Sequence, residues 1–274
     1  MQDNNKNKLN STFFLILRPL ARLFLRFGRG YREYSELSKT AFVSVASEDY
    51  GVHGRPTNVS RIAAMTGLTR KEISRIRTRL ERGEGAVIER QTPVREVINA
   101  WRSRDEFLDE AGEPAVLPLD GDEGSFRSLV RQYAGDIPEG AMKTELKRIG
   151  AVRCEEGRFR LLPDDPDRLA SEEAMAAELR AGPYPLLTAI AKNETVLRED
   201  DVWPIETVSR TTIRKSDLRR VRKLVSVRLR AATTNIADLL DAYATLQNGD
   251  AAEEKLVPVS AGVFYAEDLD TEDC

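Results

Sequence analysis

The chain has 274 residues, 41 % of them hydrophobic and 32 % charged, a globular composition that excludes collagen-like and largely disordered chains. Its length allows about two ordinary domains. With only two distant cysteines, Cys154 and Cys274, and a single histidine, His53, the chain cannot build a disulfide framework or a Cys-based zinc site. We therefore expect a reducing, cytoplasmic location, and no metal site or cofactor.

The net charge of −3 hides a division between two halves of the chain. Residues 1–104 carry 20 Lys/Arg against 10 Asp/Glu, whereas residues 105–274 carry 22 against 35. A basic N-terminal part and an acidic C-terminal part give the molecule a dipolar electrostatic field, and a polyanion would bind to the basic part.

Residues 1–29 are predicted to form a disordered start, over residues 1–10, followed by an amphipathic helix at Thr12–Phe27. The longest apolar run near the start has five residues, too short to span a membrane. Arg18, Arg22 and Arg26 recur every four residues and form one stripe on this helix. The helix can pack its apolar face on the next domain, contact phosphates through its arginines, or lie on a membrane surface.

Residues 30–82 carry the most informative pattern. A helix over Tyr31–Ser47 precedes a short helix over Asn58–Met65, which ends in a turn at Gly67. A second helix then runs from Thr69 to about Leu80, introduced by the capping box Thr69-Arg70-Lys71-Glu72. This arrangement predicts a helix-turn-helix.

Residues 30–119 are predicted to form a winged helix-turn-helix, completed by a helix at Pro93–Arg102 and a hairpin wing at 107–117. Residues 120–163 follow a similar plan, with two helices and a hairpin at Ala151–Leu162. The helix at Pro138–Ile149 of this second winged-helix-like unit offers only Lys143, Lys147 and Arg148 as cations, and we interpret the unit as a structural or dimer-contact module.

Residues 164–266 are predicted to form a C-terminal helical domain, followed by an acidic tail over 267–274. Extended stretches are expected at Thr207–Ile213 and Val257–Ala266, with a long helix from Ser216 to about Gln247 between them. Apolar residues at alternating three- and four-residue steps on this helix are typical of a dimerisation seam, although the helix can instead pack within its own domain. The predicted seam residues are Leu218, Val225, Leu229, Ala232, Ile236, Leu239, Tyr243 and Leu246.

The predicted helix-turn-helix supplies the chemistry for binding DNA. A helix in the major groove needs cations toward the phosphate walls and hydrogen-bonding side chains toward the base edges. With Ile73, Ile76 and Leu80 facing inward, the outward residues of the second helix meet both needs, and side chains at the start of the first helix can bind a phosphate. The predicted DNA-binding residues are Arg55, Asn58, Ser60, Arg61, Thr69, Arg70, Lys71, Ser74, Arg75, Thr78 and Arg79.

A second basic cluster spans 210–230, with nine Lys/Arg and one acidic residue, Asp217. It is compatible with a solvated helix face, with a second contact to the DNA backbone, or with an intramolecular partner for the acidic segments. The sequence contains no phosphate-binding glycine loop and no catalytic motif, so we expect a binding protein rather than an enzyme.

Several segments together resemble an uncharacterised family of bacterial proteins of unknown function. The likeness covers most of the chain and implies a bacterial cytosolic protein, in agreement with the helix-turn-helix. The segments that carry it are Leu17–Leu20, Tyr31–Tyr34, Gly54–Ala63, Gly67–Glu72, Phe126–Val130, Ile149–Val152 and Gly262–Tyr265.

The sequence thus predicts a mainly α protein with small β-hairpins (α+β): tandem winged-helix-like units and a C-terminal domain with a long dimerisation helix. The expected function is sequence-specific binding of double-stranded DNA by a homodimeric, nucleoid-associated bacterial transcriptional regulator, with no membrane partner and with any small-molecule effector unknown. The alternatives are a nucleoid- or partition-type architectural protein and a winged-helix adaptor that binds other proteins.

Overall fold

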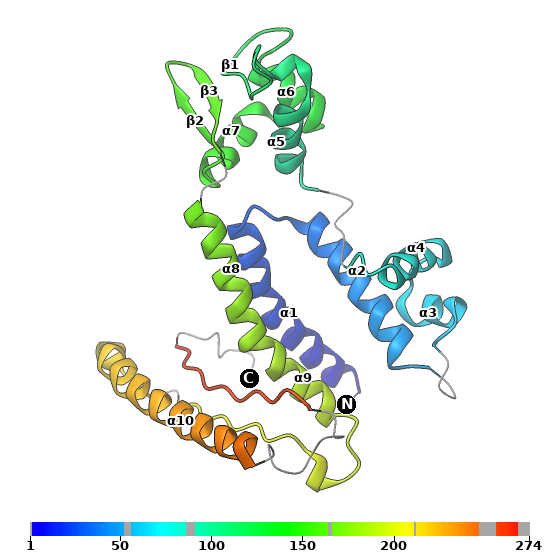
Figure 1. The fold of residues 1–274 in the computed structure, drawn as a ribbon, viewed down its shortest axis with the longest axis vertical. Coiled ribbons are helices and arrows are strands. Elements are labelled where there is room, and N and C mark those ends of the chain that lie inside the picture. Colours follow the sequence, from blue (N-terminus) through cyan, green and yellow to red (C-terminus); the bar gives the residue numbers. More distant parts are fainter. Residues whose placement is uncertain are drawn as a thin grey trace. The chain divides into compact units, whose positions relative to one another are not determined.

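The computed structural model describes residues 2–51, 56–85, 91–163, 166–210, 212–246 and 256–267. The described chain is mainly helical, with one small three-stranded antiparallel sheet, as the expected class of mainly α structure with small β elements requires. It divides into two compact units, residues 1–165 and 166–274 (Figure 1).

Helix α1 (Gln2–Arg26) begins ten residues before the start expected from the sequence. Extending a helix costs little once its first turn exists, so the polar residues at its start continue the amphipathic helix that follows. Leu20, Leu23 and Phe24 are half-buried, whereas Phe13 and Phe14 are exposed.

Three helices, α2 (Tyr31–Glu48), α3 (Val59–Thr66) and α4 (Arg70–Glu81), pack against one another around a small core. The fully buried side chains of this core include Ile62 of α3 and Ile73 and Ile76 of α4. Val43 and Ala46 of α2 complete it. The inward positions expected on α4 are therefore confirmed for Ile73 and Ile76, and Leu80 packs against their edge.

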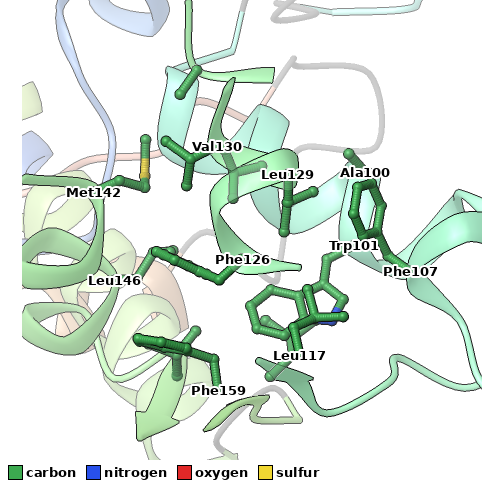
Figure 2. Close-up of a cluster of buried hydrophobic side chains, with 14 of the residues drawn as sticks. Ala100, Trp101, Phe107, Leu117, Phe126, Leu129, Val130, Met142, Leu146 and Phe159 are labelled. Carbon is green, nitrogen blue, oxygen red and sulfur yellow. The ribbon is translucent and has the colours of Figure 1, made fainter. Parts of the chain in front are cut away.

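A second, larger hydrophobic core is formed by the elements from α5 to β3, and most of its buried side chains come from helices. Figure 2 shows Phe126 between Trp101 and Phe159, and the Phe126 and Phe159 rings are stacked with centroids 4.3 Å apart. Leu129, Met142 and Leu146 enclose the same core. Its elements are α5 (Pro93–Ser103), a 3₁₀ turn (Asp105–Phe107), β1 (Leu117–Pro118), α6 (Phe126–Tyr133), α7 (Glu139–Arg148), β2 (Val152–Glu155) and β3 (Arg158–Leu161).

The sheet has the order β1-β3-β2, with β3 antiparallel to both neighbours. Cys154 pairs with Phe159, and Phe159 also pairs with Leu117. Because side chains alternate along a strand, Val152, Phe159 and Leu161 point into the core while the arginines beside them are exposed.

The wing expected at 107–117 differs from the observed structure. Leu108 and Pro114 form a single bridge around a turn, but the strand that follows pairs with β3. Trp101 and Phe107 are fully buried in the second core, so α5 packs with the elements after it rather than with α2–α4. Local apolar patterns predict the helix but not the core that receives it.

The second unit contains α8 (Pro166–Ala181), α9 (Pro183–Asn193), two 3₁₀ turns (Glu199–Asp201 and Lys215–Asp217) and α10 (Leu218–Leu246). Asn193 and Trp203 exchange two hydrogen bonds, which close the loop after α9. The described parts of 207–213 and 257–266 form no strand, because an extended segment needs a partner to pair with. None of the described side chains of this unit is buried.

Candidate nucleic-acid interface

The connection between α3 and α4 is set by three residues. Gly67 ends α3 at φ +72°, in the left-handed region that favours glycine, and its N–H donates to the Ala63 carbonyl at 2.9 Å. Thr69 then caps α4 by accepting a hydrogen bond from the Glu72 N–H at 3.2 Å. The two helices are thus joined by only three residues, Gly67, Leu68 and Thr69.

Only one of the two hydrogen bonds of the capping box expected at Thr69 forms. The Thr69 hydroxyl oxygen accepts the Glu72 N–H, but the Glu72 carboxylate lies 2.8 Å from Lys39 Nζ of α2. This ion pair fixes the start of α4 against α2 and leaves the outer edge of α4 without an acidic side chain in its first turn.

The starts of α3 and α4 meet at Ser60 and Arg70, where Arg70 Nη1 donates to Ser60 Oγ at 3.4 Å. Asn58 caps α3 by accepting the Arg61 N–H at 2.9 Å. The predicted DNA-binding residues at the start of α3 and those at the start of α4, about ten positions later in the sequence, therefore share one exposed surface. This α3–α4 surface consists of Asn58, Ser60, Arg61, Thr69, Arg70, Lys71 and Ser74, all of them exposed.

Three further predicted residues of α4 are engaged with the protein. Thr78 is exposed but donates its hydroxyl hydrogen to the Ser74 carbonyl at 2.9 Å. Arg79 is half-buried. Arg75, expected to face outward, is also half-buried, and its Nη2 lies 3.5 Å from Glu36 Oε2 of α2. The periodicity of α4 could not reveal this pairing, because Glu36 lies on another helix.

Glu36 is the site residue that sequence reasoning missed. Its side chain is only 6 % exposed and contacts both Lys39, at 3.1 Å, and Arg75. Burial alone would raise the pKa of Glu36, but the hydrogen bonds and charges of Lys39 and Arg75 hold it below its usual value. The hydrogen bonds of Lys39 to Glu72 and Glu36 raise the pKa of Lys39. Three of the five buried side chains of α2 are polar, Glu33, Glu36 and Thr40, so no apolar pattern marked Glu36 as a buried residue.

Arg77 connects α4 to the segment before α3. Its Nη1 donates to the Thr57 carbonyl at 3.3 Å, and its Nη2 lies 3.6 Å from Glu81. Arg77 therefore has a structural role. Arg55 and His53 lie outside the described residues.

The predicted dimerisation residues of α10 fall into two groups within the single chain. Leu218, Val225, Leu229, Ala232 and Ile236 are half-buried, whereas Leu239 and Tyr243 are 56 % and 61 % exposed. The Leu246 side chain lies outside the described part. The second half of α10 therefore presents apolar surface to solvent.

The basic cluster at 210–230 is exposed wherever it is described. Arg222 forms an ion pair with Glu267, whose other carboxylate oxygen accepts a hydrogen bond from the Tyr265 hydroxyl at 2.8 Å. None of the helices in the described ranges has the length and apolar character needed to cross a membrane.

Residues 7–165 match the model of a family described as "Family of unknown function (DUF6502)", and the chain belongs to that family. The match covers α2–α4 and the second core and ends at the boundary between the two units. It confirms the resemblance to an uncharacterised family. No curated protein and no solved structure matches the chain.

Proposed function

We propose that this protein binds double-stranded DNA in a sequence-dependent manner through the α3–α4 surface. The observation that carries the proposal is the exposed edge formed where Arg70 meets Ser60, with Lys71 beside it. A helix anchored on one side by Ile73 and Ile76 offers its other side to a partner. Cations and hydroxyls on that side suit the phosphates and base edges of a duplex.

In the proposed complex, α4 enters the major groove with its first turns toward the bases. Arg70 is placed to reach guanine O6 and N7, and Ser74 can contact a base or a phosphate. Asn58 and Arg61, at the start of α3, are placed to hold the backbone, where the helix N-terminus also favours an anion. Arg75 stays on Glu36 and has no direct role at the bases.

The fold supports this proposal in two ways. The compact helices α2–α4, with a three-residue connection before α4, suit a helix-turn-helix. The order α5-β1-α6-α7-β2-β3, with β1 and β2 flanking β3, suits a winged helix that follows it. Since fold alone does not define function, the side chains of the α3–α4 surface carry the argument.

We also propose that the protein acts as a homodimer, with transcriptional regulation as its role. The C-terminal unit buries none of its described side chains, and Leu239 and Tyr243 of α10 are exposed. A long amphipathic helix gains most of its stability from packing of its apolar face, and a second copy supplies a matching face. A two-fold protein would bind two half-sites of a pseudo-palindrome.

The test begins with selection of a preferred duplex from a random pool by the full-length chain. The double variant R70A/K71A should bind the selected duplex at least about tenfold more weakly than the parent, since a bidentate base contact contributes ~1–3 kcal/mol. The control K6A/K8A removes the same charge from exposed positions of α1 and should bind like the parent. Equal affinities of R70A/K71A and the parent, or no enriched sequence, would overturn the proposal and favour an adaptor role.

A further inference from the structure

The first half of α10 carries six cations, and five of them have no acidic partner within the described ranges of the chain. Arg222 pairs with Glu267, whereas Arg219, Arg220, Lys223, Arg228 and Arg230 are exposed and make no ion pair with any residue that the structure describes. No acidic side chain occurs on α10 before Asp238. On α7, by contrast, Arg148 is held by Glu145 within the same helix, at 2.6 Å.

This distribution of charge costs stability in the free protein. The N-terminal end of a helix carries partial positive charge, which repels cations of its first turn such as Arg219 and Arg220. Arg219 and Lys223, four residues apart, are like charges on neighbouring turns, and such a pair destabilises a helix. The cations therefore do not serve to stabilise α10.

The helical repeat places three of these cations in one row. At 3.6 residues per turn, Arg219, Lys223 and Arg230 lie within roughly 40° of one another around the helix axis. The row extends over about 16 Å, since each residue adds ~1.5 Å. A DNA duplex carries one negative charge per ~1.7 Å of its axis, so a row of this length can contact several phosphates.

We infer that this row, the α10 basic row (Arg219, Lys223 and Arg230), is a second DNA contact, which binds the phosphate backbone independently of sequence. The inference rests on the proposed function because it assigns the same ligand. The α10 basic row lies in the second unit of the chain, and its contact is to phosphates rather than to base edges. Arginine guanidinium groups suit it because they bind phosphate oxygens in pairs.

An anionic membrane surface fits the row less well than DNA does. A helix that lies in a membrane interface needs a free apolar face opposite its cations. On α10 the apolar residues Leu218, Val225 and Leu229 are already half-buried within the single chain. In this segment two large apolar side chains, Leu224 and Val227, are exposed, against six exposed cations.

The test compares the full-length parent with R219A/K223A/R230A on a random-sequence duplex, by fluorescence anisotropy over a series of salt concentrations. The plot of log affinity against log salt should become shallower by up to about 2.7, since each lost phosphate contact removes ~0.9. The control R180A/K192A/R198A removes three exposed cations from the same unit and should keep the parental slope. Circular dichroism checks that α10 remains helical, and R219Q/K223Q/R230Q replaces the alanine variant if it does not.

The outcomes separate this inference from the proposed function. A slope for the row variant equal to that of the parent or of the control would overturn the inference. If R70A/K71A keeps its sequence preference while R219A/K223A/R230A loses affinity for the duplex, the assignment of DNA binding to the α3–α4 surface is wrong. The assignment of a DNA contact to the α10 basic row is then supported. A loss of binding to anionic vesicles but not to the duplex would assign the row to a membrane and overturn the inference. If the parent binds no duplex, both proposals fall.

Discussion

Glu33 and Thr92, 59 positions apart, are joined by a 2.7 Å hydrogen bond from the Thr92 N–H to Glu33 Oε1. The second carboxylate oxygen of Glu33 accepts the Gly30 N–H at 2.9 Å. This buried side chain thus caps α2 and links it to the N-cap residue of α5. A Cβ at Gly30 would lie 2.6 Å from Thr92 Cγ2, so the close approach requires glycine.

Glu33→Gln should destabilise the protein, because the amide keeps only one acceptor for two partly buried N–H donors. We expect the free energy of unfolding to fall by about 1–3 kcal/mol in urea denaturation. The control Glu96→Gln removes the exposed 3.4 Å ion pair with Arg32 and should cost less than ~1 kcal/mol. Equal losses of unfolding free energy in the two variants would show that the hydrogen bonds of Glu33 contribute no more than an exposed ion pair.

Lys71→Ala and Arg75→Ala should have opposite effects, although both change an α4 cation expected at DNA. Lys71 is exposed, so its loss should weaken DNA binding and leave the melting temperature unchanged. Arg75 pairs with the buried Glu36, so its loss should cost about 1 kcal/mol of stability. Thermal unfolding and DNA titration of both variants measure this, and a stable Arg75→Ala chain with weakened binding would contradict the assignment.

Acid should weaken the contact between α2 and α4. The pKa of Glu36 is lowered in the folded chain, so its contribution is present above the unfolded pKa and is lost as pH falls through the folded pKa. Glu36→Gln should therefore flatten the fall in stability on the acid side of neutrality. Urea unfolding of both chains over a series of pH values checks this, and parallel curves would argue against the ion pairs.

Phe159→Ala should be among the most damaging single changes, because Phe159 is fully buried and stacks on Phe126 at 4.3 Å. Loss of a buried phenylalanine costs about 3–5 kcal/mol. Phe42 of α2 is 61 % exposed, and Phe42→Ala should change stability by no more than ~0.5 kcal/mol. Chemical denaturation distinguishes them, and a small loss at Phe159 would contradict the observed core.

Charges on the exposed second half of α10 should disrupt the proposed dimer. L239E/Y243E should sediment as a monomer at concentrations where the parent is a dimer, because the substituted side chains face the seam. Leu224→Glu is the control, since Leu224 is 59 % exposed and is not one of the predicted seam residues. A monomeric parent, or a double variant that still dimerises, would contradict the dimer.

Much of the helical structure could be predicted from apolar periodicity and capping residues. The expected helices of residues 31–103 agree with the observed ones to within two residues, because Gly67, Thr69 and Pro93 act locally. The grouping of α5 with α6 could not be predicted, since it depends on contacts such as Trp101 with Phe126. For the same reason, β1 pairs with a strand some forty residues later.

The residues of the candidate site could be predicted from the sequence, but the ion pairs that some of them form could not. Residues whose exposure follows from one helix, such as Lys71 and Ser74, could be placed from the period of α4 alone. Arg75 could not, because its partner Glu36 lies on α2, and no local pattern connects two charged residues across a core. Sequence periodicity indicates which way a side chain points but not which charge it meets.

The central claim is that the outer edge of α4 enters a DNA groove, and site-specific photocrosslinking tests it most directly. A photoreactive side chain placed at position 71 should crosslink to bound duplex. The same group at position 45, an exposed site on α2, should not. Crosslinks from position 45 but not from position 71, in a chain that binds DNA, would contradict the account.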